Sequence, residues 1–299
     1  MPQTFKKTHS LYKTLARTIS LVENKAANYL DILLNLSPVT NAVVIGITGP
    51  PGAGKSTLVD ALIGEIVSQQ KTAGVLCVDP SSPFNLGALL GDRIRMSQWY
   101  TNENVFIRSL ANRGSLGGLH PSIIEITDVM KDAGFDYIIV ETVGVGQTEV
   151  EIAGLADTTV IVLVPEAGDE VQTMKAGLME IGDIFVVNKA DRPGADTFVN
   201  NLRQLLFPSG HRESNAVPVV KTIAAQNVGI DILFEKINLV SKQGRNTEKQ
   251  YWLLAEKAFH LLATKRMSDV YKQDLYNKIK SENESGKAFN LYKFLESIK

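Results

Sequence analysis

The chain has 299 residues and a formal net charge of −1, from 31 Lys and Arg against 32 Asp and Glu. With 44% hydrophobic and 21% charged residues, its composition is that of a globular protein and excludes disorder along the whole length. The near-neutral balance argues against a general nucleic-acid binder. A single cysteine, Cys77, excludes a disulfide framework and a multi-cysteine zinc site, and indicates a reducing compartment.

The N-terminal region is basic, with no acid before Glu23, which is a composition also found in transit peptides. Apolar residues at helical spacing nevertheless run without a break from Leu11 to Leu33, and this pattern favours an amphipathic helix. No apolar run reaches the roughly 18 residues that a transmembrane helix needs. We therefore predict a helical N-terminal extension over residues 1–40 of a cytoplasmic protein that does not enter a membrane.

The middle of the chain, residues 41–240, alternates strand-like and helix-like segments. The strand-like segments are apolar almost throughout, as in parallel strands that helices cover on both faces. Helix-length connections separate several of them, as parallel crossovers require. We predict an α/β domain with a mostly parallel sheet and helices on both faces. The predicted strands are Ala42–Thr48, Gly74–Asp79, Tyr137–Thr142, Thr158–Val164, Ile184–Asn188 and Val217–Thr222.

A phosphate-binding loop follows the first of these strands. The pattern is G-x-x-x-x-G-K-[ST] between a strand and a helix, which is the context that a P-loop requires. Its glycines let backbone N–H groups turn toward phosphate oxygens, Lys55 reaches the β- and γ-phosphates, and the Ser56 hydroxyl can ligate Mg²⁺. The residues of the loop are Gly49, Pro50, Pro51, Gly52, Ala53, Gly54, Lys55, Ser56 and Thr57.

Two predicted strands end in acids, Asp79 and Glu141. Ligands of open parallel sheets bind at the carboxyl ends of strands, so both acids should face the site that Lys55 occupies. Glu141 could hold Mg²⁺ through water, and the N–H of Gly144, three residues on, could contact a γ-phosphate. Asp92 is a third candidate for the metal, although a solvated charge or a helix cap explains a lone acid equally well.

A base-reading loop follows the strand that ends near Val187. It has the N-K-x-D pattern, formed by Asn188, Lys189, Ala190 and Asp191. An ionised carboxylate only accepts hydrogen bonds, so Asp191 can pair with the N1–H and N2–H₂ groups of guanine but not with adenine. The stem of Lys189 can lie along the base, and Asn188 can brace the loop. A looser match to the loop that supports the guanine oxygen comprises Ile223, Ala224 and Ala225.

Together these segments make the sequence resemble the MeaB/ArgK-type GTPases, of the SIMIBI class of P-loop proteins. The resemblance covers nearly the whole chain. Ile223 stands where many relatives carry Ser, and Asn85-Leu86 replaces smaller residues, but neither departure removes a charged catalytic group. Beyond the phosphate loop, the blocks that carry the resemblance are Ala16–Asn24, Val78–Phe84, Gly87–Met96, Arg113–Gly118, Glu141–Gln147 and Asn188–Asp191.

The resemblance implies a GTPase that hydrolyses GTP to GDP with Mg²⁺ and acts as an accessory chaperone of a B12-dependent acyl-CoA mutase such as methylmalonyl-CoA mutase. It places Asp79, Asp92 and Glu141 at the magnesium and catalytic-site positions, with Asp92 in the first switch and Gly144 in the second. It also implies that Pro165–Lys175 is a third switch, which senses the nucleotide and contacts the mutase.

Two other functions remain open at this level. A nickel metallochaperone GTPase of the same class would need clustered His or Cys ligands, whereas this chain has one Cys and four scattered histidines. A nucleotide-dependent kinase linked to amino-acid transport would need an acceptor site, and the sequence indicates none.

Residues 241–299 are predicted to form a C-terminal helical extension with two apolar stripes. These stripes could pack against the chain's own GTPase domain. The resemblance instead implies that they form a homodimer, in which each stripe is buried against its copy. The stripes comprise Tyr251, Leu254, Ala255, Ala258, Phe259 and Leu262, then Leu291, Phe294, Leu295 and Ile298.

Overall fold

The computed structural model divides the chain into two compact units, Met1–Thr247 and Glu248–Lys299, which are described separately. In the first unit it describes residues 9–37, 41–79, 96–111, 119–142, 148–167, 179, 181–206 and 217–242. In the second unit it describes 251, 255, 258–259, 261–263, 265–284 and 289–298.

In the described part of the first unit, seven strands form a central sheet, and every pair of neighbouring strands is parallel. The strand order is β3-β2-β4-β1-β5-β6-β7, so the phosphate-loop strand lies in the middle. The expected α/β fold with a parallel sheet is therefore confirmed. The strands are β1 (Val43–Thr48), β2 (Ala73–Asp79), β3 (Val105–Ala111), β4 (Tyr137–Glu141), β5 (Thr158–Leu163), β6 (Ile184–Val187) and β7 (Val219–Lys221).

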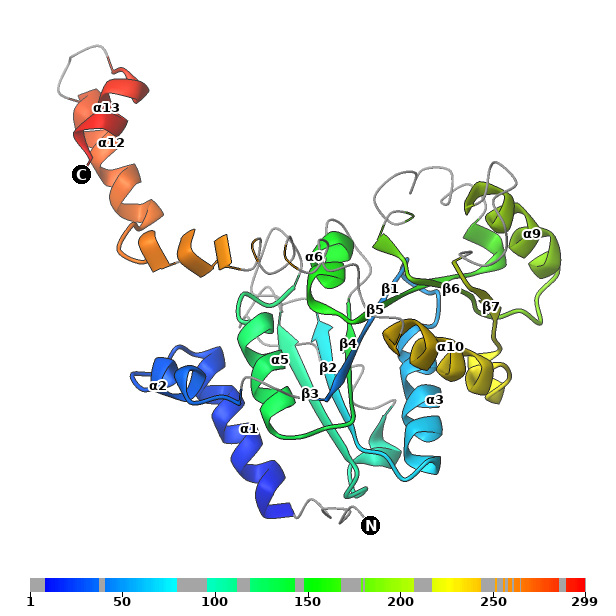
Figure 1. Ribbon diagram of the computed structural model, residues 1–299. Helices are drawn as coiled ribbons and strands as arrows, with labels where there is room; N and C mark the ends of the chain where they lie inside the picture. Colours follow the sequence, from blue (N-terminus) through cyan, green and yellow to red (C-terminus); the bar gives the residue numbers. More distant parts are fainter. Residues whose placement is uncertain are drawn as a thin grey trace. The chain divides into compact units, whose positions relative to one another are not determined.

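Helices cover both faces of this sheet (Figure 1). One face carries α3 (Lys55–Ser68) and α10 (Ile230–Lys242). The opposite face carries α1 (His9–Glu23), α5 (Ile123–Asp132), α6 (Thr148–Leu155) and α9 (Ala195–Leu206). Short helices α2 (Tyr29–Leu34), η1 (Ser97–Trp99), η2 (Pro165–Ala167) and η4 (Ala224–Gln226) lie in the connections.

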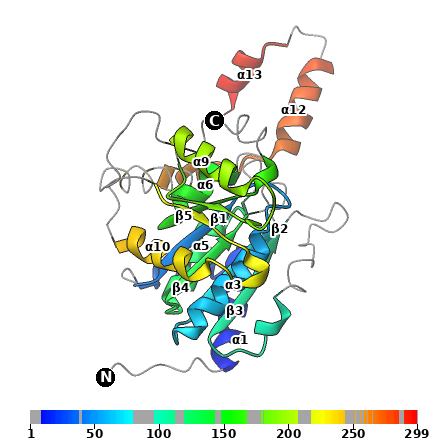
Figure 2. The same ribbon diagram turned by 90° about the vertical axis from the view of Figure 1, so that its right-hand side faces the viewer.

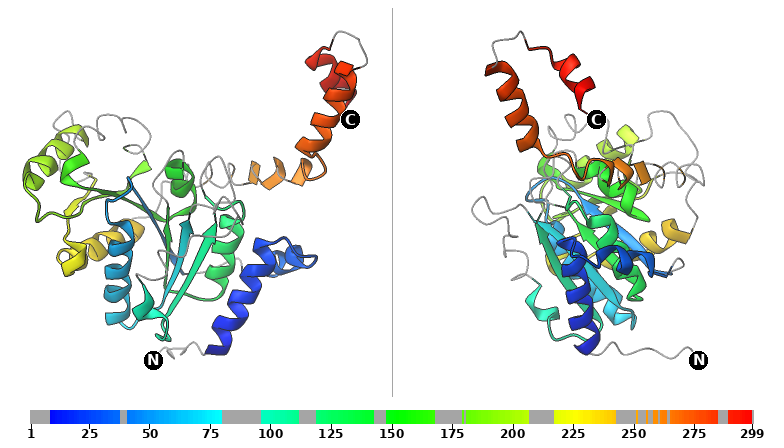
Figure 3. Two further views of the ribbon diagram at one scale, coloured as in Figure 1. Left: turned by 180° about the vertical axis from the view of Figure 1, so that it is seen from behind. Right: turned by 90° about the vertical axis from the view of Figure 1, so that its left-hand side faces the viewer.

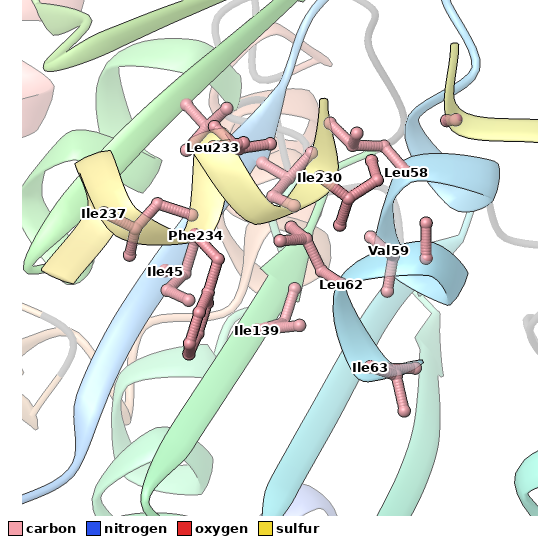
Figure 4. Packing of buried hydrophobic residues seen from close by; sticks show 14 of the residues in the cluster. Ile45, Leu58, Val59, Leu62, Ile63, Ile139, Ile230, Leu233, Phe234 and Ile237 are labelled. Atoms are coloured by element: carbon pink, nitrogen blue, oxygen red, sulfur yellow. The ribbon is translucent and has the colours of Figure 1, made fainter. Parts of the chain in front are cut away.

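The larger hydrophobic cluster lies under α3 and α10, on the face that Figure 2 shows toward the viewer. Leu58 and Leu62 of α3 and Leu233 of α10 belong to one cluster that lies over β1 and β4 (Figure 4). All three leucines are fully buried. Because α3 begins at Lys55, this packing fixes the helix that carries the phosphate-binding lysine.

The N-terminal extension differs from the unbroken helix that its apolar pattern suggests. Helix α1 ends at Glu23, and Lys25 takes a positive φ of 47° before α2 begins at Tyr29. Helix α1 packs beside α5 (Figure 3), and its Tyr12 ring lies 5.5 Å from the ring of Phe106 in β3. The expected run from Leu11 to Leu33 is therefore two helices joined by a turn.

Strand β3 is absent from the sequence-based prediction. Its centre is polar, with Arg108 and Ser109, and these residues are half-buried because β3 is an edge strand. Continuous apolar runs are typical of strands that are buried on both faces. An edge strand whose middle residues are polar and half-buried does not show this pattern.

The second unit contains α12 (Lys272–Glu284) and α13 (Leu291–Ser297). The side chain of Asn290 caps α13 by accepting hydrogen bonds from the N–H groups of Tyr292 and Lys293. The Phe289 and Phe294 rings pack 5.7 Å apart. In the described part of the whole chain, no helix is both long and apolar enough to cross a membrane.

Candidate active site

The loop between β1 and α3 has the backbone geometry of a phosphate cradle. Gly49, Gly52 and Gly54 have φ values of 140°, 77° and 87°, which residues with a side chain rarely adopt. A Cβ at Gly49 would also lie 2.1 Å from the carbonyl oxygen of Val162. Gly54 is the N-cap of α3, so the positive end of the helix dipole faces the loop.

Lys55 and Ser56 stand in the first turn of α3, and both are 7% exposed. The Lys55 ammonium donates hydrogen bonds to the carbonyl oxygens of Gly49 and Pro50, at 2.9 and 3.0 Å. The loop thus wraps around its own lysine. The next residue, Thr57, is half-buried.

The Ser56 hydroxyl donates a 2.7 Å hydrogen bond to Oε1 of Glu141, which is 4% exposed at the end of β4. The structure therefore brings together two oxygen donors that the sequence places 85 residues apart. Hydroxyl and carboxylate oxygens are the ligands that Mg²⁺ prefers, so this pair fits the implied cation. Within the described ranges, no three His, Cys, Asp or Glu side chains gather to hold a metal.

Three further residues that the sequence predicts at the site lie wholly or partly outside the described part of the chain. Asp79 is the last residue of β2, but its side chain lies outside the described part of the chain. Asp92 and Gly144 also lie outside the described residues.

Asn188 joins the phosphate loop to the two loops at the base end of the site. Its side-chain amide donates to the carbonyl of Ala53 at 2.9 Å. Its Oδ1 accepts from the Thr222 hydroxyl and from the N–H of Ala224, each at 3.1 Å. The Asn188 side chain is 2% exposed, so these bonds form in a buried environment. Asn188 is thus a brace between three loops.

The rest of the N-K-x-D loop is anchored from the same side. Lys189 has a positive φ of 55°, and its ammonium donates to the carbonyl of Gly52 at 2.7 Å. The N–H of Ala190 donates to the carbonyl of Thr222 at 3.0 Å. Asp191, next along the loop, is exposed. The Asp191 carboxylate, which the sequence assigns to guanine, is therefore exposed, whereas Lys189 and Ala190 before it are held by hydrogen bonds.

The segment after β7 contains Ile223, Ala224 and Ala225, which the sequence matches loosely to the loop that supports the guanine oxygen. Ile223 is half-buried, and its N–H donates to the carbonyl of Val228 at 3.0 Å. Ala224 is buried and Ala225 is exposed. Gly229 closes this turn with a φ of 76°, where a Cβ would meet the Lys221 carbonyl at 2.3 Å. The segment Ile223–Ala225 is thus joined to Asn188 by the hydrogen bond that the N–H of Ala224 donates.

The structure adds residues that the sequence analysis did not select. The Thr142 hydroxyl donates to that of Thr48 at 2.9 Å, which ties the ends of β4 and β1 together. The Arg192 guanidinium pairs with Glu166 of η2. Threonine at the end of a strand and arginine after a loop are common, so neither pattern distinguishes these residues from others.

The arrangement can bind a nucleotide along the carboxyl edge of the sheet. A glycine loop and a helix N-terminus form the anion end, with Lys55 as the cation and the Ser56–Glu141 pair beside it. The N-K-x-D loop forms the other end, held to the first by hydrogen bonds from Asn188 and Lys189. Hydrolysis of a nucleoside triphosphate needs this kind of positioning and electrostatic stabilisation.

Comparison with known proteins gives relatives over most of the chain. A Pyrococcus abyssi protein named as a GTPase is 51% identical over 246 residues, covering 80% of this chain and 76% of its own. The mouse mitochondrial methylmalonic aciduria type A homolog is 41% identical over 147 residues, which is 49% of this chain and 35% of that protein. The crystal structure of a LAO/AO transport system kinase matches with a TM-score of 0.63 and 22% identity, covering 96% and 91% of the two chains, and supports the fold alone.

The family model described as "Methylmalonyl Co-A mutase-associated GTPase MeaB" matches residues 15–279. This range contains the phosphate loop, the Ser56–Glu141 pair, the Asn188 brace and the N-K-x-D loop. The chain therefore belongs to the MeaB family of P-loop GTPases.

Proposed function

We propose that this GTPase is an accessory chaperone that couples its nucleotide state to cofactor loading or protection of a B12-dependent acyl-CoA mutase of the methylmalonyl-CoA mutase type. The observation that carries the nucleotide part is the Asn188 brace, because it makes the phosphate loop and the base loop one continuous site. The mutase part is supported by the description of the family to which the chain belongs.

In this proposal each end of the site recognises one part of GTP. Lys55 and the backbone N–H groups from Gly49 to Gly54 hold the phosphates, and Lys55 stabilises the charge that develops on the γ-phosphoryl group during attack by water. Asp191 accepts the guanine N1–H and N2–H₂ donors. Asn188 and Lys189 hold the base loop against the phosphate loop.

Mg²⁺ is the proposed metal, and Ser56 and Glu141 would hold it, Glu141 through water. When bound, it would supply positive charge that offsets the negative charge of the phosphates. The Ser56–Glu141 hydrogen bond holds the two oxygens side by side. The family resemblance supports Asp79 and Asp92 as further contributors to the metal site, and Gly144 as a contact of the γ-phosphate.

The proposed cycle follows from the γ-phosphate. A bound γ-phosphate can order switch segments that are released on hydrolysis, and a partner can read the difference. Isolated switch GTPases that await a partner's contribution turn over slowly, on the order of 10⁻⁴ to 10⁻² s⁻¹. We therefore expect slow turnover by the chain alone and faster turnover when its mutase binds.

The test is a single-turnover GTP hydrolysis assay with and without purified methylmalonyl-CoA mutase from the same organism, in apo and cobalamin-loaded forms. Co-purification of the two proteins is compared in GTP, GDP and no nucleotide. The proposal predicts a complex whose stability depends on the nucleotide and a hydrolysis rate that rises in it. An unchanged rate and no complex in any state would contradict the mutase coupling. Transfer of labelled γ-phosphate to an acceptor other than water would favour a kinase instead.

A further inference from the structure

The base loop has an inner half and an outer half that are held in different ways. Asn188, Lys189 and Ala190 are fixed by hydrogen bonds to the phosphate loop and to Thr222. The outer half, Asp191 and Arg192, is exposed. Asp191 is the residue proposed to read guanine, so the position of this outer half decides how well its carboxylate meets the base.

Strand order brings a second segment next to this turn. β5 and β6 are neighbours, with Leu163 opposite Val187, and the N–H of Asn188 donates to the carbonyl of Leu163 at 2.8 Å. The chain that leaves β5 therefore passes beside the base loop. Glu166 stands in η2, three residues after the end of β5.

Glu166 holds the outer half of the loop through Arg192. Arg192 closes the turn, since its N–H donates to the carbonyl of Lys189 at 3.0 Å. Its guanidinium then forms a hydrogen-bonded ion pair with Oε1 of Glu166. The hydrogen bond from Arg192, with further help from the charges of Arg192 and Lys189, lowers the pKa of Glu166 below its ordinary value. The carboxylate of Glu166 is thus charged at neutral pH, paired with Arg192 and attracted by the charge of Lys189.

We propose that Glu166 is a positioning residue for guanine recognition, which acts through Arg192 to fix the turn that carries Asp191 to the segment leaving β5. This inference rests on the proposed role of Asp191. In this proposal Glu166 acts on the turn and not on the base, so its removal leaves the chemical groups of the site intact and only loosens the turn. The loss should therefore appear in nucleotide affinity and in KM, with kcat unchanged.

The expected change in nucleotide affinity follows from the exposure of the Arg192–Glu166 ion pair. The side chains of Arg192 and Glu166 are 45% and 52% exposed, and ion pairs of this kind change an equilibrium by only about two- to fivefold. Such pairs are also screened by salt, so the effect should fade between about 0.05 and 1 M NaCl. A general loss of folding would instead lower the melting temperature and would persist at high salt.

A second exposed ion pair of the first unit provides a matched control. Lys221 and Asp196 form an exposed ion pair at 2.8 Å, which joins the end of β7 to the first turn of α9. Neither residue belongs to the segment from Asn188 to Arg192. Asp196→Asn therefore removes a comparable surface pair without releasing the turn.

The experiment measures the Kd of GDP and GTP by calorimetry, and KM and kcat for GTP, at low and high salt. Glu166→Gln and Arg192→Gln should each raise Kd and KM about two- to fivefold at low salt. Their double variant should be no worse than either, since both remove one interaction. The charge-swapped Glu166→Arg/Arg192→Glu variant should regain affinity, and Asp196→Asn should match the wild type.

Three results would overturn the inference: wild-type Kd in Glu166→Gln, additive losses in the double variant, or an equal loss in Asp196→Asn. Failure of the proposed function would look different. It would appear in the wild-type chain itself, as binding of ATP with the same affinity as GTP.

Discussion

At the scale of single residues, the phosphate end of the site depends on Lys55. Lys55 is almost fully buried, and its ammonium makes two hydrogen bonds to carbonyls of the preceding loop. Fold stability does not require a cation at this position, because the core beneath α3 is built from Leu58, Leu62 and their neighbours. The lysine is thus explained by the phosphate ligand rather than by packing.

We expect Lys55→Ala to lower GTP affinity by about ten- to a hundredfold, because hydrogen bonds to charged groups are worth roughly 1.5–3 kcal/mol each. Hydrolysis should fall below detection at GTP concentrations that saturate the wild type. Calorimetry and phosphate release measure the two effects. Lys131→Ala, which removes a lysine paired with Asp128 on α5, is the control and should behave as wild type. Normal turnover in a folded Lys55→Ala protein would remove this loop from the active site.

Residues also show where prediction from the sequence ends. The loops around Lys55 and Asn188 were predicted because their chemistry forces particular residue types at fixed spacing. The Arg192–Glu166 pair was not, since its residues lie 26 positions apart and meet only because β5 and β6 are neighbours. Strand order is a property of the whole sheet, and no local pattern encodes it.

At the scale of elements, α6 packs against β1 more closely than a side chain at Gly46 would allow. A Cβ there would lie 2.6 Å from Cγ1 of Ile152 and 2.9 Å from Cβ of Ala156. The two elements thus depend on a glycine in the strand that leads into the phosphate loop.

Helix and strand boundaries were harder to predict from the sequence than the motifs. Strand β3 has a polar centre and so lacks the continuous apolar pattern of a buried strand. The apolar stripe from Leu11 to Leu33 continues through the turn at Lys25 and so gives no sign of it.

We expect Gly46→Ala to destabilise the protein by about 1–3 kcal/mol, which is typical of an extra methyl group in a tightly packed core. Gly64→Ala is the matched control, since a Cβ there would lie 3.7 Å from the Trp99 ring, at ordinary contact distance. That change should leave stability unaltered or raise it by about 0.4–1 kcal/mol. Thermal and urea unfolding of the three proteins measure the difference. Equal stability of the two variants would show that α6 has room to move from β1.

At the scale of the whole molecule, the two units differ in how they bury apolar side chains. Among the described residues of the first unit, three hydrophobic clusters surround the sheet. Among the described residues of 248–299, Phe294 is the only buried hydrophobic side chain. Large apolar residues there are exposed, including Phe259 at 69% and Tyr292 at 79%. Exposed apolar surface of this extent is typical of an interaction site.

We expect the second unit to bury this surface in a homodimer, and the first unit to fold without it. Multi-angle light scattering should give a dimer for the full chain at tens of micromolar. The chain cut after Thr247 should be a monomer that binds GTP with unchanged affinity. A full chain that stays monomeric at these concentrations would contradict the dimer. Loss of GTP binding in the shorter chain would show that the second unit completes the nucleotide site.

We propose that the phosphate loop and the N-K-x-D loop form one guanine-nucleotide site, and base exchange at Asp191 is the sharpest test of this site. Calorimetric titration with GTP, ATP and XTP is carried out on the wild type and on Asp191→Asn. The wild type should prefer GTP over ATP by up to roughly 10⁴-fold, because adenine leaves the carboxylate unpaired. In the variant, an amide replaces this carboxylate and presents a donor to the guanine N–H groups, but it can pair with the extra carbonyl of xanthine. GTP affinity should therefore fall and XTP affinity should rise. An Asp191→Asn variant that keeps the wild-type preference for GTP would contradict the account.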